Sequence, residues 1–199
     1  FCDLVGSTAL TAQLDPEDVR QLIAVYHTRI AEVVTRYQGV IARYMGDGVL
    51  VYFGYPRAHE DDAEQAVRAG LALVDAIARL QTHVRVTLQV RVGIATGTVV
   101  VGDLLVGEGS GEQAAVGNTP NLAARLQSLA EPGAVLICAN TRRLTGGHFE
   151  YRDLGPLALK GWPEPTPAWR VLATTGVESR FEAQHKVKLP PPLGRDEQL

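Results

Sequence analysis

The spacing of apolar residues along the chain predicts three helices. Between residues 14 and 39, leucine, isoleucine, valine and tyrosine recur every three or four positions, which places them on one face of a helix. Asp15 lies directly before a proline and is the expected N-cap, while Gly39 is expected to end the helix. The same period recurs in two further segments, 60–80 and 118–130.

Continuous or alternating apolar runs predict strands around these helices. The segments 1–5 and 39–54 are typical of the end of a buried strand and of a hairpin with Asp47 at its tip, respectively. Between 84 and 97, apolar and polar residues alternate, which predicts a half-buried strand with 98–104 as its antiparallel partner. Three later runs also predict strands: 133–139, 149–155 and 166–172.

The order of these elements predicts the fold class. Strand, helix, hairpin, helix, hairpin, helix and strand follow one another, which favours an α+β fold of ferredoxin-like type, an α/β sandwich with helices packed on an antiparallel sheet. We expect the glycine-rich segment 106–112 to be a flexible loop. After Thr174 the periodicity is lost, and LPPPLG is typical of a linker. We therefore interpret the chain as a fragment of a longer protein, with a domain at 1–173 and a linker at 174–199 toward a missing C-terminal domain.

The composition narrows the classes of function. Of the 199 residues, 46% are hydrophobic and 21% are charged, as in ordinary globular domains. The net charge of -3 does not indicate a nucleic-acid-binding surface, and no apolar run is long enough to cross a membrane. Cys2 and Cys138 lie in apolar strand-like runs, so buried reduced thiols are favoured over a disulfide. These features indicate a cytoplasmic protein with no nucleic-acid or membrane partner.

Two aspartates lie between an apolar run and a glycine, in FCDLVGST and RYMGDG. If the first strand lies beside the hairpin, the carboxylates of Asp3 and Asp47 meet and repel each other unless a cation lies between them. Mg²⁺ or Mn²⁺ takes such oxygen ligands, and two aspartates can bridge two of these ions. The backbone carbonyl of Leu4 would be a further ligand. Taken alone, Asp47 is equally explained by a polar turn, but its pairing with Asp3 favours a metal site.

Two further segments have residues suited to binding phosphate. Gly6, Ser7 and Thr8 follow the first aspartate, where backbone N–H groups near a helix start can hold phosphate oxygens. Asn121 and Arg125 are four residues apart on a predicted helix and therefore share a face. The arginine fork suits phosphate oxygens. An ordinary solvated helix surface is the alternative for Arg125, but the residues around it look buried.

Three stretches in this order, FCDLVGST, RYMGDG and VGNTPNLAARL, together resemble the catalytic motifs of the class III nucleotidyl cyclases, the adenylate and guanylate cyclase domain. The resemblance covers about residues 1–172. It implies that Asp3 and Asp47 hold two divalent metal ions, Mg²⁺ or Mn²⁺. It also implies that Asn121 orients the ribose and that Arg125 stabilises charge on the reacting phosphate, both from the other subunit of a dimer.

The resemblance further implies a reaction and an assembly. The ribose 3′-oxygen of ATP would attack the α-phosphorus and release pyrophosphate, giving 3′,5′-cyclic AMP. Because the motifs divide over two surfaces, one chain cannot complete a site, and a homodimer with two equivalent sites is expected. Lys160 matches a lysine that touches the triphosphate in some members of the family, although a lysine at a strand edge is ordinary.

The positions that read the purine depart from the family pattern. Arg43 stands where adenylate cyclases usually have lysine, and Ala114 where they have aspartate or threonine. Arg43 keeps a cationic donor for adenine N1 or guanine O6, whereas Ala114 cannot accept a hydrogen bond from the adenine amino group. Guanylate cyclases typically have glutamate at the first position, so ATP is favoured over GTP with loose base selectivity. The neighbouring Gln113 is a polar substitute for the missing acceptor.

Other functions stay open. A nucleotide-binding regulatory module that has lost turnover is one, although the presence of Asp3, Asp47, Asn121 and Arg125 favours activity. A diguanylate cyclase or polymerase-palm relative would share the sheet and the metal carboxylates, but the NLAAR helix argues against it. The tail, ESRFEA followed by LPPPLGRDEQL, resembles the junction in large bacterial proteins where a cyclase domain precedes a signalling ATPase module.

Overall fold

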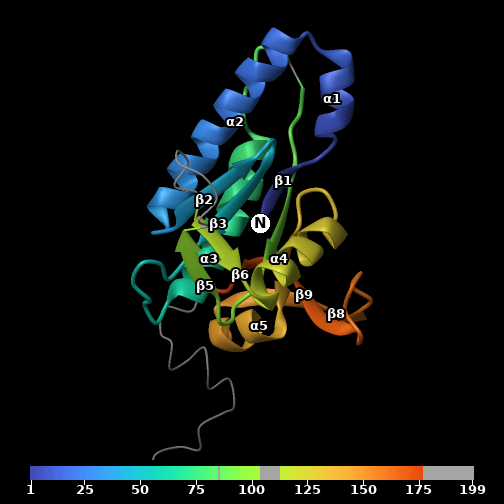
Figure 1. Ribbon diagram of the computed structural model, residues 1–199. Helices are drawn as coiled ribbons and strands as arrows, with labels where there is room; N and C mark the ends of the chain where they lie inside the picture. Colours follow the sequence, from blue (N-terminus) through green and yellow to red (C-terminus); the bar gives the residue numbers. More distant parts are fainter. Residues whose placement is uncertain (85, 104–112, 177–199) are drawn as a thin grey trace, which may run out of the picture.

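The computed structural model describes residues 1–84, 86–103 and 113–176. Within these residues a seven-stranded sheet of order β2-β3-β1-β4-β7-β9-β8 forms the centre of the molecule (Figure 1). Its strands are β1 (Cys2–Leu4), β2 (Val40–Met45), β3 (Gly48–Tyr52), β4 (Val90–Ile94), β7 (Val135–Cys138), β8 (Phe149–Leu157) and β9 (Thr166–Thr174). All neighbouring strands are antiparallel except β4 and β7. The predicted α+β sandwich is confirmed, with one parallel pair in its sheet.

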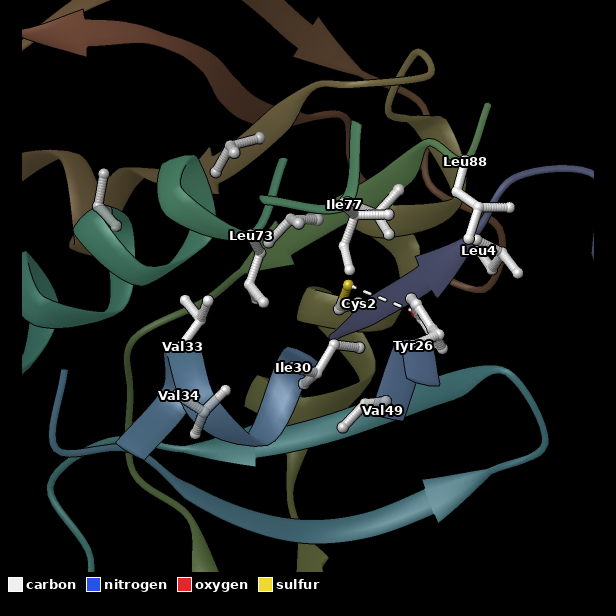
Figure 2. Packing of buried hydrophobic residues seen from close by; sticks show 14 of the residues in the cluster. Cys2, Leu4, Tyr26, Ile30, Val33, Val34, Val49, Leu73, Ile77 and Leu88 are labelled. Carbon is white, nitrogen blue, oxygen red and sulfur yellow. Dashed lines mark hydrogen bonds between the residues drawn. The ribbon is translucent and has the colours of Figure 1, made fainter. Parts of the chain in front are cut away.

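Helices cover the two faces of this sheet. They are α1 (Ser7–Gln13), α2 (Pro16–Arg36), α3 (Asp62–Ala78), α4 (Asn118–Leu129) and α5 (Ala139–Thr145). Val135 and Ile137 of β7 belong to the core formed with α2 and α3, whereas Leu136 and Cys138 belong to a second cluster with Leu126 of α4. Because side chains alternate along a strand, α2 and α3 lie on one face and α4 on the opposite face. Figure 2 shows side chains of the first core.

Helix α2 confirms the predicted apolar stripe and the predicted start, but not the predicted end. Asp15 is the N-cap residue before Pro16, as predicted, although its side chain makes no capping hydrogen bond. The left-handed residue after the helix is Gln38, with φ 61°, and not Gly39. Gly39 is needed for close packing instead, because a Cβ there would lie 2.8 Å from side-chain atoms of both Phe53 and Val34.

The predicted hairpin is confirmed. Strands β2 and β3 pair from Val40 opposite Tyr52 to Met45 opposite Gly48, so that Gly46 and Asp47 form the turn. The first strand and the later strands are also confirmed as β1, β7, β8 and β9.

The two cysteines are buried free thiols, as predicted. Within the described residues, no helix has both the length and the apolar character needed to span a bilayer.

The predicted strand at 84–97 is mostly wrong. Only Val90–Ile94 forms a strand, β4. Strand β1 has three residues and pairs with positions 90–92, so the preceding segment has no strand beside it to complete a ladder. Leu88 is nevertheless buried, which explains the apolar signal.

The predicted pairing of 84–97 with 98–104 is also wrong. Val100–Asp103 forms β5 and pairs with β6 (Gln113–Val116) in a separate two-stranded sheet, while the neighbours of β4 are β1 and β7. The short helix α5 was not predicted, and α1 was predicted only as a helix start near residues 6–8. The predicted loop at 106–112 and the part of the predicted linker beyond residue 176 lie outside the described residues.

Candidate active site

The two candidate metal aspartates lie side by side. Strand β1 is flanked by β3 and β4, and Asp3 is paired with Arg91 of β4. Its neighbours Cys2 and Leu4 are buried in the core with α2 and α3, so Asp3 points to the opposite face of the sheet. Asp47 approaches it there from the hairpin turn. Burial and the proximity of Asp47 together raise the pKa of Asp3 above its ordinary value.

The carboxylate of Asp47 has an unsatisfied oxygen. Its Oδ2 atom is buried and has no hydrogen-bond partner among the described residues. A buried polar atom without a partner is costly, and here it lies next to a second carboxylate. These residues therefore fit a divalent cation, which takes hard oxygen ligands. Such an ion would bind the unpartnered oxygen and reduce the repulsion between the two carboxylates.

The protein ligands of such a cation are few. Within the described part of the chain, no group of three or more histidine, cysteine, aspartate or glutamate side chains is gathered as for a metal. An ion here would depend on the two carboxylates, on backbone carbonyls, and on oxygens from water or nucleotide. Leu4 follows Asp3 at the end of β1, and its carbonyl as a ligand stays a prediction.

Helix α2 supports the turn that presents Asp47. The Tyr26 hydroxyl donates a hydrogen bond of 3.0 Å to the backbone carbonyl of Asp47. Tyr26 is fully buried, and its hydroxyl lies 3.9 Å from Cys2 Sγ (Figure 2). Burial raises the pKa of the Cys2 thiol to about 11. The sequence indicated Tyr26 only as a member of the apolar stripe, and its role at the turn was missed.

His27 lies beside Tyr26 and contacts the same turn. The centroid of its ring is 4.2 Å from that of Tyr44 on β2. Burial lowers the pKa of His27, and the nearby backbone of Gly46 acts in the opposite direction. His27 was not predicted to contribute to the site.

Gln127 of α4 is a further site residue that the sequence did not reveal. Its side-chain Nε2 donates a hydrogen bond of 3.3 Å to Asp3 Oδ2. The helix is held close to β4 at Gly93, where an added Cβ would overlap the backbone of Ala123 and Gln127. Glycine at this position is thus required for the close approach of α4.

Asn121 and Arg125 share one face of α4, as predicted, but are not brought to the aspartates of their own chain. Both side chains are exposed, while Ala123 and Leu126 bury the opposite side of the helix. Within the described residues, neither side chain forms a hydrogen bond or ion pair with Asp3 or Asp47.

The other phosphate-binding candidates lie apart from one another. Gly6, with φ 72°, directly precedes α1, and Ser7 and Thr8 begin that helix, as predicted. Lys160 is exposed in the turn between β8 and β9, at the far edge of the sheet from β2.

The two purine-reading positions lie on neighbouring strands. Arg43 pairs with Leu50, whose neighbours Val49 and Val51 pack toward α2 and α3. Arg43 therefore lies on the same face of the sheet as Asp3. Ala114 lies in β6, which runs close to β2.

A cavity of about 300 Å³ lies away from the carboxylates. It borders Cys2 and the segment 50–55, and its lining includes neither Asp3 nor Asp47. Because β3 runs away from the turn that carries Asp47, this cavity is at the other end of the strand. We do not assign it to the site.

Comparisons with known proteins agree with this geometry. Residues 1–173 match the family described as "Adenylate and Guanylate cyclase catalytic domain". The uncharacterized protein R02095 of Rhizobium meliloti is 35% identical over 184 residues, which are 91% of this chain and 18% of that protein. The next curated relatives have 40% of their length covered, so this chain corresponds to a minor part of each of these proteins.

Two solved structures are also similar. The adenylyl cyclase CyaB from P. aeruginosa is 29% identical with a TM-score of 0.77, and the match covers 87% of this chain and 91% of that one. The guanylyl cyclase Cya2 is 32% identical with a TM-score of 0.77, and the match covers 88% of this chain and 90% of that one. With the match over 1–173, these likenesses show that the chain belongs to the family of adenylate and guanylate cyclase catalytic domains.

Proposed function

We propose that this cyclase domain is an adenylate cyclase that converts ATP to 3′,5′-cyclic AMP and pyrophosphate in a homodimer. The observation that carries the proposal is the pair of adjacent carboxylates, Asp3 and Asp47, one with a buried oxygen that lacks a partner. Cations stabilise two neighbouring carboxylates, and a two-metal reaction on a triphosphate requires a site that binds such cations.

The residues of one chain would hold the metals and the phosphates. Asp3, Asp47 and the Leu4 carbonyl would bind Mg²⁺ or Mn²⁺, which when bound lowers the pKa of the ribose 3′-hydroxyl and shares the charge that develops on phosphate. Gly6, with Ser7 and Thr8 behind it, would direct backbone N–H groups to phosphate oxygens. Tyr26 and His27 would keep the turn in place from behind.

The second chain would supply the groups on α4. Asn121 would orient the ribose, and Arg125 would stabilise charge on the reacting phosphate. Their exposure and their separation from the aspartates of their own chain support this division. Lys160 would reach the triphosphate from the same surface, since Leu157, three residues earlier, packs in the cluster of Leu122 on α4.

The site would recognise the purine base with low selectivity. Arg43 would donate to adenine N1, while Ala114 would leave the amino group without its usual acceptor. One missing hydrogen bond costs about 1–3 kcal/mol, which weakens binding without preventing it. The absence of glutamate at position 43 favours ATP over GTP, although CyaB and Cya2 are equally similar in fold.

We further propose that this domain works within a longer chain. Residues 1–173 would form the catalytic domain, and 174–199 would link it to a regulatory or ATPase domain. The much greater length of the curated relatives supports this organisation.

A product assay tests the function. The purified protein is incubated with ATP or GTP and Mn²⁺ or Mg²⁺, and products are separated by chromatography, with Asp47→Ala as control. We expect cyclic AMP that disappears in the variant. Mainly cyclic GMP would identify a guanylate cyclase instead. Nucleotide binding without any cyclic product would contradict the enzyme and favour a regulatory nucleotide-binding domain.

A further inference from the structure

Gln127 is in a position to orient Asp3. Its amide donates to Oδ2 of Asp3 at 3.3 Å. Asp3 Oδ1 points to the other side, 3.7 Å from where a Cβ on Gly48 would be. Gly48 follows Asp47 in the hairpin. The amide thus fixes one carboxylate oxygen and leaves the second directed at the turn that carries Asp47.

The donor is held firmly. Gln127 is half-buried, and its own backbone packs against Gly93 of β4 without space for a Cβ. Strand β4 in turn pairs with β1 across Asp3 and Arg91. Within the described residues, Gln127 supplies the one side-chain N–H group that Asp3 accepts. Such a bond to a charged acceptor restricts the carboxylate to one orientation.

The same helix carries Asn121 and Arg125 on an exposed face that is turned away from Asp3. We propose that Gln127 is a positioning residue for the metal carboxylate Asp3 of its own chain, so that α4 serves both sites of the dimer: its own through Gln127, and that of the partner subunit through Asn121 and Arg125. This inference depends on the proposed function. Gln127 would affect the affinity for the metal and would not contact the nucleotide.

Metal binding without turnover gives the first test. Gln127→Met keeps the length of the side chain and removes the amide. Ser128→Ala is a matched control, because the exposed Ser128 hydroxyl bonds, among the described residues, only to the Arg125 carbonyl of its own helix. Free Mn²⁺ is measured by electron paramagnetic resonance in the absence of nucleotide. We expect Gln127→Met to weaken Mn²⁺ binding about fivefold, the effect of one ordinary hydrogen bond, and Ser128→Ala to leave it unchanged.

Steady-state kinetics then separate positioning from a general defect. At saturating Mn²⁺, Gln127→Met is expected to recover the wild-type kcat and the KM for ATP, because the metal itself then orders Asp3. Unchanged Mn²⁺ affinity, or a kcat that stays low at saturating Mn²⁺, would overturn the inference. If Asp47→Ala also binds Mn²⁺ as tightly as the wild type, the metal site and the proposed function fail together, whatever the effect of Gln127.

Mixed dimers show which site Gln127 serves. One chain carries Arg125→Ala and keeps its aspartates, and the other carries Asp47→Ala and keeps its arginine, so that one site per dimer is intact. The Mn²⁺ concentration for half-maximal rate is expected to rise about fivefold only when Gln127→Met is on the chain that supplies the aspartates. A rise only when the change is on the chain that supplies Arg125 would contradict the assignment.

Discussion

At the scale of single residues, the adjacent carboxylates of Asp3 and Asp47 impose a cost on the fold. The pKa of Asp3 is raised, so folding favours its neutral form. The stability that this group contributes is therefore present at low pH and is lost as the pH rises through the raised pKa. At neutral pH the ionised pair destabilises the protein until a cation binds.

We expect Asp3→Asn to be more stable than the wild type without divalent ions. The amide removes the repulsion, and the unfolding midpoint should rise by about 2 °C in EDTA. Added Mn²⁺ should raise the midpoint of the wild type and leave that of the variant unchanged. Differential scanning calorimetry with and without Mn²⁺ makes the measurement. A variant less stable than the wild type in EDTA would show that the carboxylates do not repel each other.

Tyr26 gives a second prediction at this scale. Tyr26→Phe removes the hydroxyl that bonds the Asp47 carbonyl and keeps the buried ring. The free energy of unfolding should fall by about 1 kcal/mol, with weaker Mn²⁺ binding because the turn is less ordered. Tyr37→Phe is the control, since Tyr37 packs on the same core and its hydroxyl makes no hydrogen bond among the described residues. Urea unfolding measures the free energy of unfolding of both variants. Equal decreases in the two variants would argue against a special role for Tyr26.

At the scale of elements, the sequence pattern predicted the helices and strands that depend on residues close together in the chain. The apolar stripe of α2 and the GDG hairpin follow from period and turn chemistry alone. The alternation at 84–89 led to a wrong prediction, because an alternating segment becomes a strand only beside another strand, and β1 pairs only with positions 90–92. Gly39 misled because its small size serves packing against Phe53, which the sequence does not reveal.

The residues of the candidate site also divide into those that local sequence predicted and those that it did not. Asp3 and Asp47 were predicted to meet because each lies between an apolar strand-like run and a glycine, and because the first strand was expected to lie beside the hairpin. Gln127 and Tyr26 were missed because one glutamine on a helix and one tyrosine in an apolar stripe are ordinary. Their contacts join residues 124 and 21 positions apart, and only the packing of α4 and α2 on the sheet brings them together.

The close packing of α4 on β4 gives a prediction for a whole helix. In Gly93→Ala, the new methyl group would overlap the backbone of Ala123 and Gln127, so the helix must move. We expect a loss of about 3 kcal/mol in the free energy of unfolding, together with weaker Mn²⁺ binding. Gly102→Ala in β5 is the control, since no atom of the described residues lies within 4 Å of an added Cβ there. Chemical denaturation and Mn²⁺ titration would show whether the two glycines differ.

At the scale of the whole molecule, the proposed function requires one chain to present two half-sites on one face of its sheet. Helix α4 packs on β4 and β7, while Asp3 on β1 and Arg43 on β2 lie farther along the same face. Asn121 and Arg125 are exposed on α4. A two-fold dimer that joins these faces would bring the α4 groups of each chain to the aspartates of the other, because such a contact is reciprocal.

Complementation tests this arrangement. Asp47→Ala and Arg125→Ala should each be inactive as homodimers, since every site then lacks either a metal ligand or the arginine. Mixed in equal amounts and allowed to exchange, they should recover about a quarter of the wild-type rate, because half of the dimers would be mixed and each would hold one intact site. A mixture of Asp3→Ala with Asp47→Ala is the control and should stay inactive, because both changes lie in the same half-site. Activity in that control would place Asp3 and Asp47 in different half-sites. No activity in the first mixture, despite proven exchange, would place Asp47 and Arg125 in the same half-site, and either result would contradict the arrangement.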